Sequence, residues 1–293
     1  MLVREEGDAV LVIGQASHAW LSGQLAPLVE GRTLQALEIS DPRWCEPLAP
    51  EALQDALVGR RVERLGRRGK YMLWEAADDV TLLLHLRMTG TLLYDAGEGT
   101  PYRRVRFVLD DGHVLSFHDP RRFGTGELAV GPEALAEFLG SRLGAEPLGT
   151  DFTTERLRME ARGRRAPIKA FLLDQRRVAG VGNIYADEAL FRARIHPLRP
   201  VGTLKRPQIT ELRDAVVASL EAGIDAKGAT IDDFRHADGA EGGFQDRFLV
   251  HLREGEPCVR CGTAIRKLRA AGRGTYVCER CQPKPRVRRP AAR

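Results

Sequence analysis

The sequence lacks long apolar runs, a secretory leader and internal repeats. No stretch approaches the ~20 consecutive apolar residues that a membrane-spanning helix requires. The apolar stretch nearest the N-terminus, Leu11 to Ile13, is too short for the core of a signal peptide, and Glu5, Glu6 and Asp8 precede it. We therefore expect a cytoplasmic protein with no membrane partner.

Acidic residues are scarce in one part of the chain only. The 293 residues include 43% hydrophobic and 29% charged residues, as in an ordinary globular protein of about two domains. Eleven of the 45 Lys and Arg residues but only one of the 40 acidic residues lie between Pro257 and the C-terminus. A basic block beside an acidic body predicts binding to a polyanion. Residues 284–293, rich in Pro and Arg, are expected to form a solvated tail instead.

Cysteine is also scarce, and its spacing is informative. Four of the five cysteines form two Cys-x2-Cys pairs separated by 16 residues, namely Cys258, Cys261, Cys278 and Cys281. This pattern predicts one tetrahedral Zn²⁺ site, because paired knuckles at such a distance bring four thiolates together. Four protein ligands leave no open position, so the metal is expected to be structural. Disulfides are the alternative, and a cytosolic compartment disfavours them.

The pattern of apolar residues changes along the chain. It predicts strands at 33–39, 61–66, 71–75, 80–88, 104–109 and 114–118, a density typical of a sandwich or barrel. Beyond residue 153 it predicts helices at 155–161, 168–174, 183–193, 205–222 and 230–234. Between the two cysteine pairs, the sequence predicts a hairpin whose turn is Gly272-Arg273-Gly274.

A glycine-rich segment, Val178-Ala-Gly-Val-Gly-Asn183, lies between two predicted helices. A turn of this kind at a helix N-terminus presents free N–H groups to a phosphate. The same residues also suit a tight turn between packed helices, and the spacing alone leaves both interpretations open.

Several segments together resemble one family, the formamidopyrimidine-DNA glycosylases. Residues 173–197 resemble the family's helix-two-turn-helix signature, and residues 255–282 resemble its zinc hairpin. Three shorter family motifs also have counterparts: Gly66-Arg-Arg-Gly-Lys-Tyr71, His85-Leu-Arg-Met-Thr-Gly90 and Asp119-Pro-Arg-Arg-Phe-Gly124. The five segments follow the family's order, and the resemblance as a whole extends from about Gln24 to Gln282.

The resemblance implies an α+β fold in three parts. We expect a β-sandwich N-terminal domain at 1–135, a helical helix-two-turn-helix domain at 150–245, a four-cysteine zinc finger at 250–282 and a basic tail at 283–293. The implied activity is that of a DNA glycosylase and AP lyase in base-excision repair. Such enzymes remove oxidised purines (8-oxoguanine and formamidopyrimidines) from duplex DNA after flipping the base out of the stack. An amine attacks C1′, a Schiff base forms, and β,δ-elimination cuts the strand. The family also implies a monomer associated with the nucleoid.

The resemblance also assigns roles to individual residues. Lys70 matches the lysine that acts near C1′, and Arg273 matches the hairpin arginine that holds a phosphate and assists elimination. Three further DNA contacts implied by the resemblance fill the space left by the flipped base: Met88, Arg121 and Phe123. Asn183 matches the asparagine that binds a backbone phosphate, and Arg164 and Tyr102 match other DNA contacts. Tyr102 stands where many members carry a histidine. Lys169 matches a basic family position of unassigned role.

The N-terminal segment departs from the family pattern. Family members begin Pro-Glu-Leu-Pro-Glu, and the proline amine is the nucleophile. Counting back from Gln24 places the proline near Ile13 and the glutamate near Gly14. Neither residue can perform that chemistry.

Three explanations of this departure remain open. The native protein starts at another residue, or the chain binds damage without cutting it, or another amine replaces the proline. Lys70 and the Met1 α-amino group are the candidates for such an amine, and an α-amino group with a pKa near ~7.7–8.0 is partly neutral at physiological pH. The alternative function is therefore a catalytically impaired protein that binds damaged DNA or abasic sites. A zinc protein with other partners is a third interpretation, and it would bind abasic and intact duplexes equally.

Overall fold

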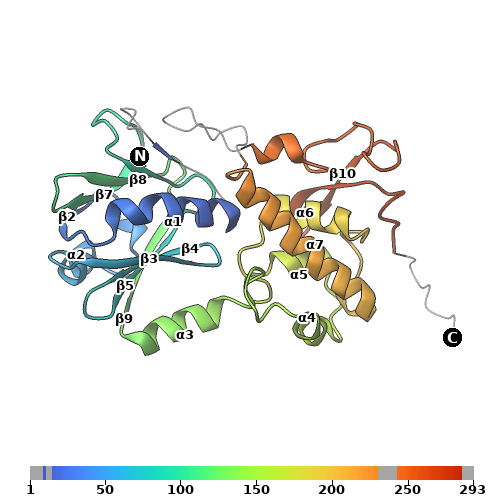
Figure 1. The fold of residues 1–293 in the computed structure, drawn as a ribbon, viewed down its shortest axis with the longest axis horizontal. Helices are drawn as coiled ribbons and strands as arrows, with labels where there is room; N and C mark the ends of the chain where they lie inside the picture. The colour runs from blue at the N-terminus through green and yellow to red at the C-terminus, as the bar shows by residue number, and fades with distance from the viewer. Residues whose placement is uncertain (1–8, 11–14, 230–242, 286–293) are drawn as a thin grey trace. The chain divides into compact units, whose positions relative to one another are not determined.

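The chain forms two compact units in the structure, a computed structural model that describes residues 9–10, 15–229 and 243–285 (Figure 1). The first unit comprises Met1–Arg142 with Gly223–Gln245, and the second comprises Leu143–Ala222 with Asp246–Arg293. The tail expected at 284–293 falls almost entirely outside the described residues. No described helix is long and apolar enough to cross a membrane.

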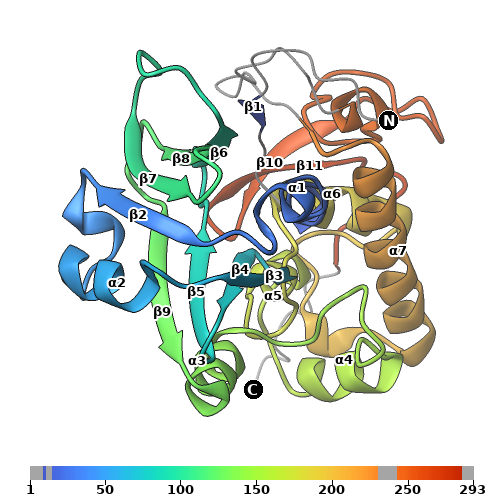
Figure 2. The same ribbon diagram turned by 60° about the vertical axis from the view of Figure 1, so that its left-hand side comes forward.

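Two antiparallel sheets make up the first unit. One sheet has the strand order β1-β6-β8-β7-β2, and its strands are β1 (Ala9–Val10), β6 (Thr91–Tyr94), β8 (Val114–His118), β7 (Arg103–Leu109) and β2 (Leu34–Ile39). The other has the order β3-β4-β5-β9, and its strands are β3 (Val62–Arg68), β4 (Tyr71–Ala76), β5 (Val80–His85) and β9 (Thr125–Val130). Strands β5 and β9 pair along their whole length and lie side by side in Figure 2.

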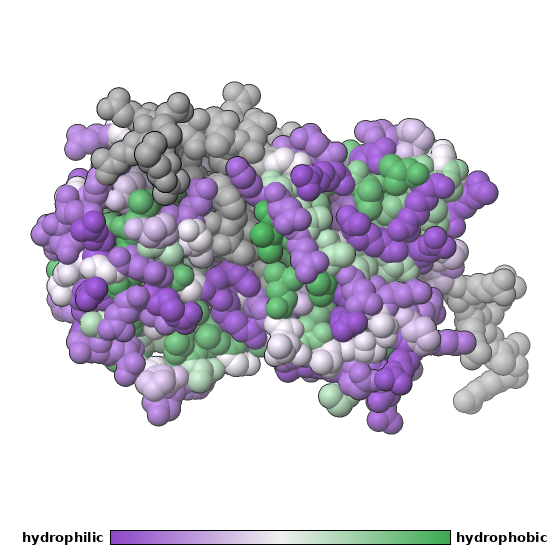
Figure 3. All heavy atoms as spheres, viewed as in Figure 1, coloured by the Kyte–Doolittle hydropathy of each residue, from purple (hydrophilic) through white to green (hydrophobic). Residues whose placement is uncertain are grey.

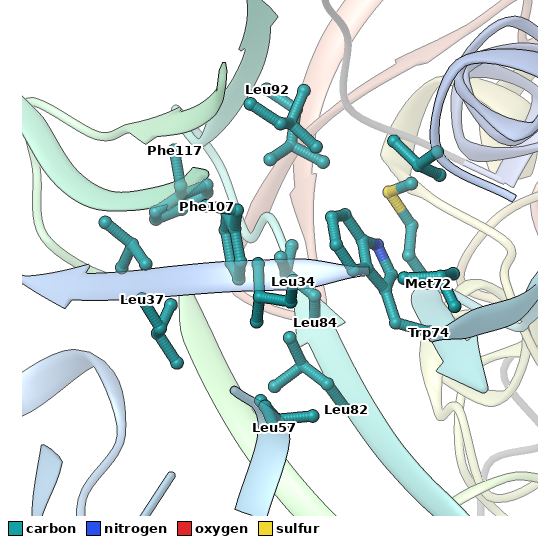
Figure 4. Close-up of a cluster of buried hydrophobic side chains, with 14 of the residues drawn as sticks. Leu34, Leu37, Leu57, Met72, Trp74, Leu82, Leu84, Leu92, Phe107 and Phe117 are labelled. Atoms are coloured by element: carbon teal, nitrogen blue, oxygen red, sulfur yellow. The ribbon is translucent and has the colours of Figure 1, made fainter. Parts of the chain in front are cut away.

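The inner faces of the two sheets enclose the core (Figure 4). In β7 every second residue is buried, so that Val105, Phe107 and Leu109 face inward. Phe107 packs against Trp74 of the other sheet, with ring centroids 4.9 Å apart. Each buried aromatic or aliphatic side chain contributes roughly 1.5–3 kcal/mol, so this layer stabilises the first unit.

Helices flank the sheets of the first unit. They are α1 (Gln15–Val29), the 3-10 turn η1 (Pro42–Trp44), α2 (Pro50–Leu57) and α3 (Pro132–Arg142). The sequence did not indicate α2 or α3, although Pro50 and Pro132 stand at their first positions, where a missing N–H is tolerated. Strands β6 and β9 were also missed. The strand expected at 80–88 ends at His85, because residues 86–89 turn back toward β6.

The second unit is helical and ends in the hairpin. Its elements are α4 (Thr154–Ala161), α5 (Ile168–Leu173), α6 (Asn183–Arg192), η2 (Val201–Thr203), α7 (Arg206–Asp225), η3 (Phe244–Arg247), β10 (Arg266–Ala270) and β11 (Arg273–Val277), although the last residues of α7 and the first of η3 belong to the first unit. Each predicted helix that falls on described residues is present, and the helix expected at 230–234 lies outside them. The expected fold, a β-sandwich followed by a helical part and a zinc hairpin, is confirmed.

The hairpin turn differs from the expectation by a shift of register. Ala271 and Gly272 both have positive φ angles, 51° and 73°, which is the geometry of a two-residue hairpin turn. Arg273 therefore begins strand β11 instead of occupying the turn.

Polar and charged side chains cover much of the visible surface of each unit (Figure 3).

Candidate nucleic-acid interface and zinc centre

The four cysteines predicted as metal ligands come together at the base of the β10–β11 hairpin. Their sulfur atoms all lie within 4.8 Å of one another, with 3.9 Å between Cys258 and Cys281 and 3.5 Å between Cys261 and Cys278. A tetrahedral site with Zn–S bonds of ~2.3 Å requires sulfur separations of about 3.8 Å, so the geometry fits zinc. The cluster binds one structural zinc. The fifth cysteine, Cys45, is buried in the core of the first unit.

A buried polar network supports the tip of this hairpin. The Lys169 Nζ donates to Asp187 Oδ1 at 2.7 Å, to Thr275 Oγ1 at 2.7 Å and to the Gly274 carbonyl at 3.2 Å. Lys169, Asp187 and Thr275 are each fully buried. Burial lowers the pKa of Lys169, and the neighbouring Asp187 carboxylate opposes that shift. The other Asp187 oxygen lies 2.8 Å from His251 Nδ1. The network therefore fastens β11 to helices α5 and α6.

Glu188, the neighbour of Asp187, anchors the segment that leads to the zinc site. Its carboxylate accepts the backbone N–H groups of Leu249, Val250 and His251 at distances of 3.0–3.1 Å. Burial raises the pKa of Glu188, and the three N–H donors act in the opposite direction. Sequence patterns gave no sign of this role, because one acidic residue in a helix has many possible partners.

Asn183 stands at the start of α6, directly after the glycine-rich turn. Gly180 has a φ of 81°, and its N–H donates to the Gln175 side chain, which holds the turn closed. The Asn183 Nδ2 donates to the Gly274 carbonyl at 3.1 Å, while its Oδ1 has no partner. The first N–H groups of a helix also lack intrahelical partners. The turn connects α5 to α6, as the helix-packing interpretation expects, and the phosphate-binding interpretation stays a prediction.

The two predicted arginines of the second unit are exposed. Arg273 begins β11, one residue before the carbonyl that both Lys169 and Asn183 approach. Arg164 lies in the turn after α4, and its Nη2 is 3.8 Å from the Glu160 carboxylate. Its Nε also donates to the Glu160 carbonyl. An exposed ion pair of this kind contributes little to stability.

The first unit presents its predicted DNA contacts on turns at one group of strand ends. Met88 lies in the β5–β6 turn and is 52% exposed, and Phe123 lies in the β8–β9 loop and is 49% exposed. The Arg121 guanidinium lies over the Phe123 ring, 5.0 Å from its centre. Lys70 occupies the tight β3–β4 turn after Gly69, which has a φ of 59°. Tyr102 is exposed in the loop before β7 and has a φ of 65°.

Two buried carboxylates behind these turns were not singled out from the sequence. Asp119 is fully buried and directs its carboxylate into the loop that carries Arg121 and Phe123. Asp41 accepts from Arg122 Nε at 2.6 Å and from Arg43 Nε at 3.2 Å. The hydrogen bond from Arg122 lowers the pKa of Asp41. In the sequence, Asp119 stood out only as the first residue of the Asp119–Gly124 motif.

Comparisons with known proteins agree with this geometry. Family models match residues 20–126 (formamidopyrimidine-DNA glycosylase N-terminal domain), 143–235 (formamidopyrimidine-DNA glycosylase H2TH domain) and 255–284 (a zinc finger found in FPG and IleRS). A formamidopyrimidine-DNA glycosylase from Heliobacterium modesticaldum is 42% identical over 263 residues, covering 88% of this chain and 95% of that protein.

Solved structures of a Lactococcus lactis Fpg are similar as well. Its complex with DNA containing an abasic site has a TM-score of 0.86 at 33% identity, covering 93% of this chain and 100% of that one. Its complex with DNA containing Fapy-dG has a TM-score of 0.84 at 33% identity, covering 92% and 99%. On the strength of the matching domain models and relatives, the chain belongs to the formamidopyrimidine-DNA glycosylase family.

Proposed function

We propose that this protein is a base-excision DNA glycosylase and AP lyase that removes oxidised purines from duplex DNA. The observation that carries the proposal is the exposure of Met88 and Phe123 on tight turns, with Arg121 over the Phe123 ring. Large apolar side chains held in water do not stabilise a fold, and they suit a wedge that enters a base stack. The Fpg relatives solved with abasic-site and Fapy-dG DNA support the choice of ligand.

The side chains have complementary tasks in this proposal. Met88, Arg121 and Phe123 occupy the space left by the flipped base and offset part of the unstacking energy. Lys70, a cation on a constrained turn, contacts the sugar and phosphate near C1′. An amine of the chain forms the Schiff base at C1′. Ile13 and Gly14 lie outside the described part of the chain. They are the positions at which the family's proline and glutamate would fall.

The second unit supplies the phosphate contacts. Asn183 donates to the Gly274 carbonyl, and the exposed Arg273 directly precedes Gly274 in β11, so the proposal assigns an amide donor and a cation to one phosphate. A phosphate bound there receives a charge-assisted hydrogen bond from Arg273. Arg164 of the same unit and Tyr102 of the first unit add further contacts to DNA. Zinc holds the hairpin that presents Arg273, and it takes no part in the bond-breaking steps. We infer that the protein acts as a monomer in the nucleoid.

Strand cleavage tests the proposal directly. The protein is mixed with a duplex carrying 8-oxoguanine opposite C, and the nicked product is measured against an undamaged duplex. We expect lesion-dependent nicking with phosphates at both ends of the gap. Tight abasic-site binding without nicking would show instead a damage-binding protein of the same fold. Equal binding of abasic and intact duplexes would contradict both functions.

A further inference from the structure

Behind the exposed turns of the first unit, one carboxylate gathers hydrogen bonds from two separate loops. Asp119 Oδ1 accepts the Arg121 N–H at 3.1 Å, and Oδ2 accepts the N–H groups of Phe123 and Gly124, both at 2.8 Å. The Thr89 hydroxyl donates to Oδ1 from the other turn. A fully buried carboxylate with four donors is well compensated, and each donor loses its acceptor if the carboxylate is removed.

The four donors lie on or next to the side chains that the proposed function assigns to DNA. Arg121 and Phe123 are held through their own backbone N–H groups, and Met88 is held through the adjacent Thr89. The backbone of Asp119 extends the set, since its N–H donates to the Tyr102 carbonyl at 3.0 Å. Asp119 therefore contacts the three segments of the first unit that carry Met88, Tyr102 and the Arg121–Phe123 pair.

A second feature fixes the separation of the two loops. Gly90 closes the Met88 turn and Gly124 closes the Phe123 loop, and both press against the ring of Phe117. A Cβ added at Gly90 would stand 2.7 Å from that ring, and one added at Gly124 would stand 2.3 Å from it. These distances exclude any side chain, so both loops are packed on one aromatic surface below the carboxylate.

The remaining residue of the loop is tied down by its side chain. Arg122 has a φ of 60°, which turns its guanidinium away from Arg121 and toward the buried Asp41. A left-handed conformation at a non-glycine residue is strained and persists only where the surroundings enforce it. The two neighbouring arginines of the motif thus have different tasks, one exposed and one structural.

From these contacts we propose that Asp119 is a positioning residue, which couples the Met88 turn to the Arg121–Phe123 loop so that the wedge enters the duplex as one rigid body. The proposal rests on the proposed function. Its role is distinct from that of a catalytic residue, because its carboxylate is buried and touches no substrate. If the wedge residues became ordered only on binding, the entropy cost of ordering them would lower the affinity for DNA. A wedge that is already ordered avoids that cost.

The test removes the link between the loops while leaving the wedge residues intact. Thr89→Val deletes the hydroxyl with little change of shape, and Asp119→Asn neutralises the carboxylate. Each variant is titrated with two duplexes, one intact and one carrying a tetrahydrofuran abasic analogue opposite 2-aminopurine. We expect the preference for the abasic duplex to fall by about tenfold, as when one charge-assisted hydrogen bond is lost. Affinity for the intact duplex should not change, and the change in 2-aminopurine fluorescence should shrink.

Two control variants separate positioning from general destabilisation. Thr89→Ser keeps the hydroxyl and should keep the preference. Leu115→Val weakens the core of the same unit at a buried position and should also keep it. The inference is overturned if Thr89→Val and Asp119→Asn retain the parent's preference, or if Leu115→Val loses it equally. A parent protein that shows no preference for the abasic duplex would refute the proposed function, which is a different outcome.

Discussion

Replacing Lys169 by methionine should weaken the second unit selectively. Methionine keeps most of the apolar stem but removes the ammonium group, which makes three hydrogen bonds in the interior. Asp187, which is 0% exposed, then loses its cationic partner and keeps its contacts with His251 and the Tyr276 N–H. Breaking a buried pair by removing one partner costs ~3–5 kcal/mol. Because Asp187 keeps its contact with His251 Nδ1, we expect the free energy of unfolding to fall by about 3 kcal/mol.

The double variant Lys169→Met/Asp187→Asn sharpens this prediction. It removes the stranded charge, so its loss of stability should be smaller than the sum of the two single losses by about 1–2 kcal/mol. Hydrogen exchange measures the effect locally, since peptides from α6 and β11 should lose protection while those from β4 and β5 do not. All three tryptophans lie in the first unit, so their fluorescence provides an independent control. Additive losses, or equal deprotection of both units, would refute the assignment of this network.

Three further predictions follow from the same contacts. Asn183→Ala and Arg273→Ala should each weaken binding to every duplex by about tenfold. Arg273→Ala should also lower the salt dependence of the affinity by about one counterion, as titrations at several salt concentrations would show. Unchanged affinities would contradict the phosphate contacts. Chelation of zinc should unfold the hairpin and abolish DNA cleavage while tryptophan fluorescence stays native, whereas normal cleavage by metal-free protein would rule out the role given to the hairpin. The partners of Asp41 lower its pKa, so the ionised carboxylate stabilises the fold at pH values above its unfolded pKa of ~3.9, and this stabilisation is lost as the pH falls through the folded pKa. Asp41→Asn should therefore lower the free energy of unfolding by about 1–2 kcal/mol at pH 7 and by little near pH 3, as urea titrations would show. A difference independent of pH would exclude this charge effect.

The sequence predicted the parts of the fold that depend on local patterns. The cysteine spacing was sufficient for the zinc site, because two knuckles can close around only one tetrahedral metal. Helices α4 to α7 followed from apolar periodicity. Strand β6 was missed because it has only four residues, and β9 because its two buried positions are Gly126 and Ala129, which give no alternating pattern of large apolar residues. The pairing partners of both strands lie far away in the chain. Such long-range pairing leaves no local signal.

The supporting residues of the site could not be predicted in the same way. Lys169 is separated from Thr275 by 106 positions, and three strands lie between Thr89 and Asp119 in the chain. In the sequence, a buried acidic residue on a helix or loop cannot be told from a solvated one, because only the folded structure shows its burial. The register of the hairpin turn was also missed, because Gly272 and Gly274 are equally good candidates for a positive φ until the strand pairing is known.

Borohydride trapping tests the central claim most directly. The protein, with the sequence given, is mixed with a duplex carrying 8-oxoguanine opposite C, and the Schiff base is reduced to a stable amine. We predict a covalent protein–DNA adduct that requires the lesion, and peptide mapping would identify the amine that formed it. The absence of any adduct, on both the 8-oxoguanine duplex and an abasic duplex, would contradict the assignment of glycosylase and lyase activity to this chain.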